Sequence, residues 1–75
     1  MPKAGRYFVV CLKNNGYEVS LEKLKIYIAL KDNSAEKHRL LRVIDESGED
    51  YLYPRTFFAA VKLTPAVGQA VLTAK

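Results

Sequence analysis

Hydrophobic and polar residues alternate in several short runs along the chain, with the period expected of β-strands that have one buried face. Such runs occupy residues 25–30, 40–45 and 50–53, and a shorter one occupies residues 60–63. Residues 6–12, RYFVVCL, are apolar at every position from Tyr7 onward, which favours a strand covered on both faces. The pattern therefore predicts a mainly β fold.

The same alternation predicts which side chains point into the protein. In residues 25–30 we expect the aliphatic side chains to face the interior and the residues between them to face solvent. The predicted inward set is Ile26, Ile28 and Leu30, and the outward set is Lys25, Tyr27 and Ala29. The predicted core of the whole chain consists of Leu24, Ile26, Ile28, Val43, Ile44 and Phe58.

Turn-forming residues separate the predicted strands. Gly16 in KNNGYE and Gly48 in ESGE suit the positive φ of tight turns, so we expect a turn after the first strand and a hairpin at Ser47 and Gly48. Pro54 has no N–H to donate to a sheet, and it favours a single 3₁₀ turn in PRTFF. Residues 20–23, SLEK, predict a tight turn, with one helical turn capped by Ser20 as the alternative.

Two segments outside the strands carry helical signals. Residues 31–39 lack hydrophobic periodicity and predict a loop, with Ser34 as the candidate cap of a brief helical turn. Thr64 followed by Pro65 is typical of a helix start, and we expect a short α-helix over about residues 65–74. Its apolar stripe is Val67, Ala70, Val71 and Ala74.

The apolar stripe of the C-terminal helix requires a hydrophobic partner surface. The outer face of the first strand, residues 6–12, offers one within the same chain, so we expect a monomer. The alternative is a homodimer in which two copies of the stripe meet across a two-fold axis, where Gly68 and Ala70 would allow close approach.

Length and composition indicate one domain, residues 1–75, whose hydrophobic content of 49% argues against intrinsic disorder. Cys11 is the only cysteine, so no internal disulfide forms, and one Cys with one His is too few for a structural zinc site. The longest apolar run, residues 7–12, is too short to span a bilayer or to form the core of a signal peptide. We therefore expect a cytoplasmic protein without metal or cofactor.

Charge is distributed unevenly along the chain. The net charge is +4, but four of the eight acids lie at the predicted hairpin tip: Asp45, Glu46, Glu49 and Asp50. We expect this tip to be solvated, because it lacks the spacing of a calcium loop. The densest basic cluster contains Lys37, Arg39 and Arg42 beside His38. Such a cluster could bind nucleic-acid phosphates, although charge of this kind also serves solubility alone.

The order of predicted elements resembles the Src-homology-3 domain and related small five-stranded barrels. EVSLEKLKIYIAL is similar to that family's diverging-turn segment with the strand after it, and YLYPRTFF is similar to its Tyr-Ile-Pro-Ser-Asn-Tyr-Val signature. The resemblance covers about residues 7–63. It implies a small antiparallel barrel over about residues 6–63, with a 3₁₀ turn, and it leaves the C-terminal helix outside.

The resemblance also implies a binding face. In the family a proline-rich ligand lies across aromatic side chains and the proline of the 3₁₀ turn. The implied partner-binding residues are Tyr7, Leu52, Pro54 and Phe57, with Tyr53 and Phe58 in core positions. Because the chain has no Trp and Glu18 is the only acid of the long loop, we do not carry over the proline-rich ligand.

A second similarity concerns RVIDESGEDYLYP, a run that resembles one in short bacterial proteins without an assigned activity. It implies a bacterial source and no function.

No catalytic constellation is recognisable in the sequence. His38 has no partner acid at a recognisable spacing, and Cys11 lies in the most apolar strand, where a thiol usually acts as a small hydrophobe. We therefore expect a non-enzymatic binding module. Protein–protein interaction through an aromatic face near the 3₁₀ turn is the leading hypothesis, and nucleic-acid binding through residues 37–42 is the alternative.

Overall fold

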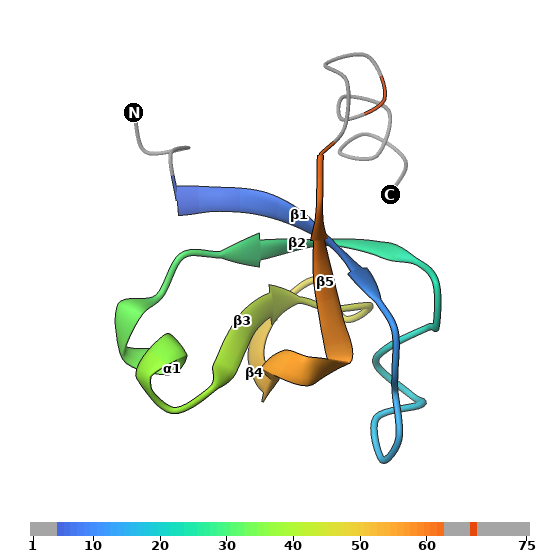
Figure 1. Ribbon diagram of the computed structural model, residues 1–75. Helices are drawn as coiled ribbons and strands as arrows, with labels where there is room; N and C mark the ends of the chain where they lie inside the picture. Colours follow the sequence, from blue (N-terminus) through green and yellow to red (C-terminus); the bar gives the residue numbers. More distant parts are fainter. Residues whose placement is uncertain (1–4, 63–66, 68–75) are drawn as a thin grey trace.

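Five antiparallel strands in one sheet make up most of the fold (Figure 1). The computed structural model describes residues 5–62 and residue 67 of the chain. The strands are β1 (Arg6–Cys11), β2 (Ile26–Leu30), β3 (Leu40–Ile44), β4 (Asp50–Pro54) and β5 (Phe58–Val61). A short helix, α1 (Asn33–Lys37), joins β2 to β3, and a 3₁₀ helix, η2 (Arg55–Phe57), joins β4 to β5. The mainly β prediction is confirmed.

The strand order in the sheet is β4-β3-β2-β1-β5, so β4 and β5 form its edges and the sheet is not closed into a barrel within the described residues. The sheet is nevertheless strongly bent, and β5 passes in front of the turn between β3 and β4 in Figure 1. The two edge strands meet across the core, because the rings of Tyr53 in β4 and Phe58 in β5 have centroids 6.0 Å apart. This bend creates the concave face that holds the core.

The predicted orientation of β2 is wrong, since Tyr27 and Ala29 are buried while Ile26, Ile28 and Leu30 are half-buried on the opposite face. The Tyr27 hydroxyl accepts a hydrogen bond from the Glu22 backbone N–H (2.8 Å) and donates one to Glu46 (2.6 Å). An aromatic residue with a satisfied hydroxyl can therefore occupy the interior.

Ala29 is fully buried on the same face of the sheet as Tyr27, because side chains alternate along a strand. It lies opposite Tyr7 of β1 and Val43 of β3. The larger aliphatic residues of β2 consequently share the other face with Phe8 and Ile44, which are also half-buried.

Of the remaining predicted core residues, Val43 and Phe58 are buried, as expected. Ile44 is only half-buried, and Leu24 is 76% exposed. Leu24 adopts a positive φ of 67° in the turn that precedes β2, which directs its side chain away from the sheet. Leu21 takes the interior position that was predicted for Leu24, with 1% exposure.

The core cluster lies on the concave face and includes residues from every strand. Its buried members are Val9, Cys11, Leu21, Tyr27, Ala29, Leu41, Val43, Tyr53 and Phe58. Cys11 has 0% exposure, and burial raises the pKa of its thiol. This agrees with its predicted role as a small hydrophobe.

The predicted turns are present, with local differences. Gly16 (φ 85°) and Gly48 (φ 86°) have the positive φ that their turns require. Residues 33–37 form α1 where a loop was predicted, and its cap is Asp32 rather than Ser34, because the Asp32 carboxylate accepts from the Ala35 N–H (3.0 Å). The last strand, β5, begins at Phe58, two positions before the predicted start at residue 60.

The acidic hairpin tip is only partly solvated, so the expectation for it is wrong at its first residue. Asp45 is 6% exposed, and its carboxylate accepts hydrogen bonds from the Tyr53 hydroxyl (2.6 Å) and from the Ser47 N–H (2.9 Å). Glu46 contacts Tyr27 and Lys25. Glu49 and Asp50 are exposed, as predicted.

Most of the predicted C-terminal helix, residues 65–74, lies outside the described residues, so the predicted docking of this helix on the first strand and the alternative homodimer both stay predictions. Among the helices that the structure describes, none combines the length and the apolar character needed to cross a membrane.

Candidate functional site

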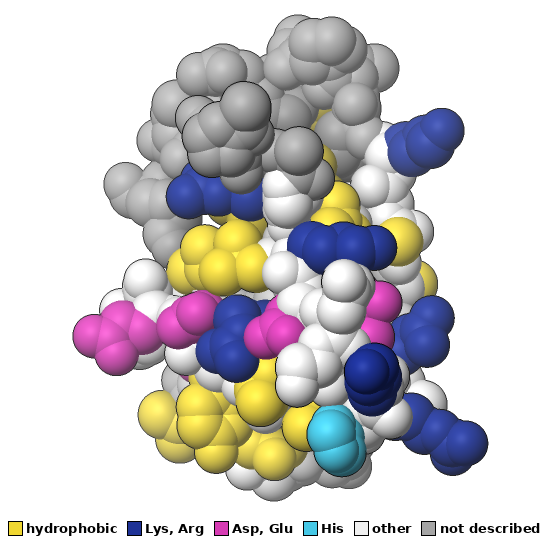
Figure 2. All heavy atoms as spheres, turned by 90° about the vertical axis from the view of Figure 1, so that its left-hand side faces the viewer, with side chains coloured by type: hydrophobic (Ala, Val, Ile, Leu, Met, Phe, Trp, Pro, Cys, Tyr) yellow, Lys and Arg dark blue, Asp and Glu magenta, His cyan; other side chains and the backbone are white. Residues whose placement is uncertain are grey.

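The basic cluster proposed from the sequence does not form a uniformly positive surface. Arg42 is ion-paired through Nε to Asp32 (2.8 Å) and through a terminal nitrogen to Asp50 (3.4 Å). Lys37 and Arg39 are exposed at the end of α1. Figure 2 looks at the molecule from the side on which Figure 1 draws α1, and it shows basic and acidic side chains next to one another. This mixed charge weakens the attraction for phosphate groups.

The four partner-binding residues implied by the family resemblance are distributed over different surfaces. Leu52 and Pro54 flank the buried Tyr53 in β4 and lie opposite Arg42 and Leu40 of β3. Because side chains alternate along a strand, Leu52 lies on the face opposite the core.

Phe57, the third of these residues, packs on the concave side against Tyr17, with ring centroids 5.9 Å apart. Tyr17 also contacts Tyr53 (4.9 Å) and the exposed Tyr51 (6.4 Å). Most of these rings therefore fill the core and its margin rather than line one continuous groove.

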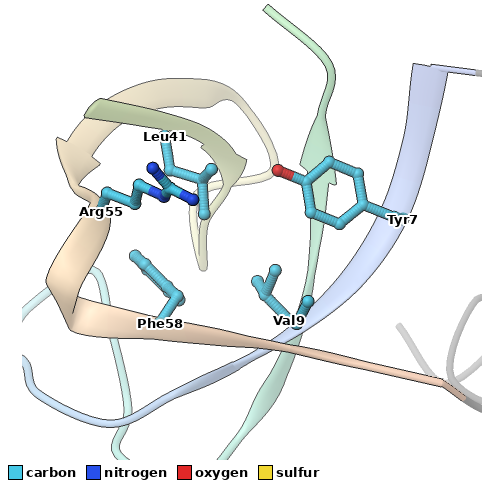
Figure 3. A pocket seen from close by; sticks show the side chains of 6 residues that line it. Tyr7, Val9, Leu41, Arg55 and Phe58 are labelled. Carbon is cyan, nitrogen blue, oxygen red and sulfur yellow. The ribbon is translucent and has the colours of Figure 1, made fainter. Parts of the chain in front are cut away.

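Tyr7, the fourth residue, lines a cavity of about 240 Å³ on the concave face beside η2 (Figure 3). Strands β1, β3 and β5 contribute to this cavity together with the 3₁₀ helix. Its lining consists of Tyr7, Val9, Leu41, Arg55, Phe58 and Ala60.

The floor of the cavity is apolar and its rim is accessible. Val9, Leu41 and Phe58 are buried, with 1%, 7% and 8% exposure. Arg55 and Ala60 are exposed, and Tyr7 is half-buried. A ligand that reached the floor would therefore contact three aliphatic or aromatic side chains and pass a basic group at the rim.

Local backbone geometry sets the position of Arg55. Pro54 has φ −57° and leads into η2, which ends where the Phe58 N–H bonds to the Arg55 carbonyl. The Arg55 N–H in turn donates to the Arg39 carbonyl (3.0 Å). The turn thus directs Phe58 into the core and keeps Arg55, three residues earlier, at the surface beside it.

The two polar groups of the cavity are the Tyr7 hydroxyl and the Arg55 guanidinium. Figure 3 shows the Tyr7 hydroxyl and the Arg55 guanidinium pointing toward one another from opposite sides of the cavity. Burial raises the pKa of Tyr7 and the Glu36 carboxylate raises it further, while the Arg55 charge opposes both effects. The Tyr7 hydroxyl is therefore neutral near pH 7 and can donate a hydrogen bond.

Of the residues that line the cavity, only Tyr7 belongs to the partner-binding set predicted from the sequence. The sequence does not predict that the others form a site. Val9, Leu41 and Phe58 have the pattern of ordinary core positions, because nothing in the sequence tells a packed core position from the floor of a cavity. A usable signal did exist at Arg55, which is a basic residue directly after Pro54 in a turn and three positions before the core residue Phe58.

Cys11 and His38, the other candidate reactive residues, each lie beside a backbone carbonyl group. The Cys11 thiol is buried and donates to the Lys13 carbonyl (3.2 Å). The His38 ring nitrogen Nδ1 lies 3.0 Å from the Ser34 carbonyl oxygen, at an exposed site. In the part of the chain that the structure describes, His, Cys, Asp and Glu side chains form no group able to hold a metal ion.

Comparisons of this chain with protein-family models, curated proteins and solved structures yield no match.

Proposed function

We propose that the chain is a small non-enzymatic binding module that holds an apolar anchor residue of a protein partner in the cavity beside η2. The observation that carries this proposal is a preformed opening of about 240 Å³ with a buried apolar floor of Val9, Leu41 and Phe58. Protein interfaces commonly draw much of their binding energy from a few anchor side chains that fill such pockets.

The size of the cavity favours a side chain over a free small molecule. Its volume of about 240 Å³ is below the range of roughly 300–1,000 Å³ that is typical of small-molecule and cofactor sites. One inserted side chain fits this space, and the remaining contacts of such a partner would lie on the surrounding surface.

The ionisable groups of the cavity are suited to binding rather than to proton transfer. An effective general acid or base has a pKa near the working pH. Arginine remains protonated at neutral pH, and the pKa of Tyr7 lies above the ordinary tyrosine value. Neither group exchanges protons readily near pH 7, which supports a non-enzymatic role.

We also propose that the domain is a Src-homology-3-like fold. The strand order β4-β3-β2-β1-β5, with a 3₁₀ helix between β4 and β5 and a long connection between β1 and β2, supports this relationship. The proposed binding surface stays beside the 3₁₀ turn, but it is centred on Tyr7, Arg55 and Phe58 rather than on Leu52 and Pro54.

Selection of peptides against the full-length protein tests the proposal. Peptides that bind should lose at least about tenfold in affinity for Ala60→Phe, because the new ring blocks the cavity rim. Val19→Phe is the matched control, since it adds the same ring at a position that is 98% exposed and does not line the cavity. Equal binding to both variants and to the wild type would refute the cavity as the site.

Fluorescence anisotropy with random oligonucleotides tests the nucleic-acid alternative. Arg42 already has two carboxylate partners, so we expect no more than weak, salt-sensitive binding. Tight oligonucleotide binding that is lost in Lys37→Gln with Arg39→Gln and retained in Ala60→Phe would overturn the proposal in favour of nucleic acid.

A further inference from the structure

Arg55 places a cationic group at the rim of the cavity without a protein counter-ion among the residues described. The ion pairs in that part of the chain are Lys25–Glu46, Arg42–Asp32 and Arg42–Asp50. The Arg55 guanidinium instead faces the cavity, opposite the Tyr7 hydroxyl (Figure 3). Both groups are hydrogen-bond donors, so together they match an acceptor, and the positive charge favours an anionic one.

The donors and the apolar floor lie within one small space. Tyr7 and Arg55 line the same cavity of about 240 Å³ as Val9, Leu41 and Phe58. The ligand must therefore carry a negative charge and an apolar side chain close together. The last residue of a polypeptide does so, because its carboxylate and its side chain are attached to the same Cα.

We infer that the cavity binds the free C-terminal carboxylate of a partner protein whose last residue is apolar. This inference rests on the function proposed above and specifies its ligand. The terminal side chain contacts Val9, Leu41 and Phe58, while the carboxylate accepts hydrogen bonds from the Arg55 guanidinium and the Tyr7 hydroxyl. An internal Asp or Glu meets these requirements less well, since its carboxylate and a neighbouring apolar side chain belong to different residues.

The Glu36 carboxylate opposes this binding, so a substitution at Glu36 gives a further test of the inference. Its carboxylate acts on the Tyr7 hydroxyl from α1, although it does not line the cavity. A negative charge that acts on the Tyr7 hydroxyl also repels a carboxylate that approaches this hydroxyl. Glu36→Gln should therefore bind a carboxylate ligand about two- to threefold more tightly, and it should bind a neutral ligand unchanged.

The smallest ligand that tests the site is a single blocked amino acid, used once with its terminal carboxylate and once with an amide in place of the carboxylate. N-acetyl-leucine and N-acetyl-leucinamide differ only in the carboxylate, and they are titrated into the ¹⁵N-labelled full-length protein while amide chemical shifts are followed. We expect N-acetyl-leucine to shift the amides of Tyr7, Val9 and Phe58, with a dissociation constant in the millimolar range that suits so small a ligand. The amide should bind about tenfold more weakly, because it lacks the charge-assisted hydrogen bonds.

Two substitutions assign this preference to Arg55. Arg55→Gln should abolish the difference between the two probes, and Arg55→Lys should restore only part of it, because lysine lacks the planar fork of donors. Lys23→Gln is the control, since it removes the same charge from an exposed residue that does not line the cavity. That variant should keep the full difference.

The outcomes separate the inference from the proposed function. Equal binding of the two probes at the cavity would overturn the carboxylate inference while leaving the apolar anchor site intact. Shifts confined to other surfaces, or no shifts with either probe at millimolar concentrations, would overturn both. A carboxylate preference that survives Arg55→Gln would also refute the assignment.

Discussion

Tyr53 brings a hydroxyl group into the core, where it meets a charged partner. The residue is 1% exposed, and its hydroxyl donates to the Asp45 carboxylate at 2.6 Å. Burial raises the pKa of Tyr53 to about 12, and the hydrogen bond to Asp45 contributes to this shift. The hydroxyl therefore links β4 to the hairpin tip only in its neutral form.

The Tyr53 pKa predicts a loss of stability at alkaline pH. An unfolded tyrosine ionises near pH 10, whereas the folded residue does so at about pH 12. Its stabilisation is thus complete below pH 10 and decreases as the pH rises toward 12, by about 2–3 kcal/mol. Tyr53→Phe should lower the free energy of unfolding by about 2 kcal/mol at neutral pH and show a flatter alkaline limb. Urea unfolding at several pH values measures both effects.

The lowered pKa of Asp45 predicts how the free energy of unfolding changes at acidic pH. Burial alone would raise its pKa, but the hydrogen bonds from Ser47 and Tyr53 outweigh burial and lower it. A lowered Asp pKa stabilises the fold above about pH 4, and this contribution disappears as the pH falls through the folded pKa. Asp45→Asn should therefore be less stable at pH 7 and lose less stability on acidification. Glu49→Gln, which removes a carboxylate at an exposed tip position, is the control for the change in net charge.

At the scale of elements, the connection between β1 and β2 contributes to the core through Leu21 and not through Leu24. The first side chain is 1% exposed and the second is 76% exposed. The sequence could not separate the two, because Val19, Leu21 and Leu24 are spaced irregularly for a strand and both a tight turn and one helical turn were open for residues 20–23. The choice depends on the turn, in which Leu24 adopts a positive φ of 67°.

These two leucines form a matched pair for mutagenesis. Leu21→Ala should cost about 2–5 kcal/mol, because it leaves a cavity in the core. Leu24→Ala should change the free energy of unfolding by less than about 0.5 kcal/mol, as is usual at the surface. Chemical denaturation of both variants measures the difference. Equal effects, or a larger effect at Leu24, would show that the connection packs differently.

The strands and turns were largely predictable from local chemistry, whereas their orientation was not. Alternation located β2 and β3 to within one residue, and the Pro54 signal located η2. The inward face of β2 was assigned wrongly because aliphatic residues were ranked above Tyr27, whose hydroxyl finds partners only in the folded chain. The hydrogen bond from Tyr27 to Glu46 joins segments that are distant in the sequence, so local periodicity cannot predict it.

For the whole molecule, the cavity depends on the bend that brings β5 opposite β3. Tyr7 was recognised through a family resemblance, and Arg55 lies at a turn that the sequence predicted. Their convergence over Val9, Leu41 and Phe58 depends on long-range packing, so the sequence alone did not reveal it. The proposed function requires that a partner bind where these residues converge.

Nuclear Overhauser contacts between a selected peptide and the full-length protein locate the bound side chain of the peptide. We expect contacts from one apolar side chain of the peptide to Val9, Leu41 and Phe58, with shifts at the Tyr7 and Arg55 amides. Contacts to Leu52, Pro54 and Leu40 on the opposite face of the sheet, with the cavity signals unchanged, would contradict the proposed function.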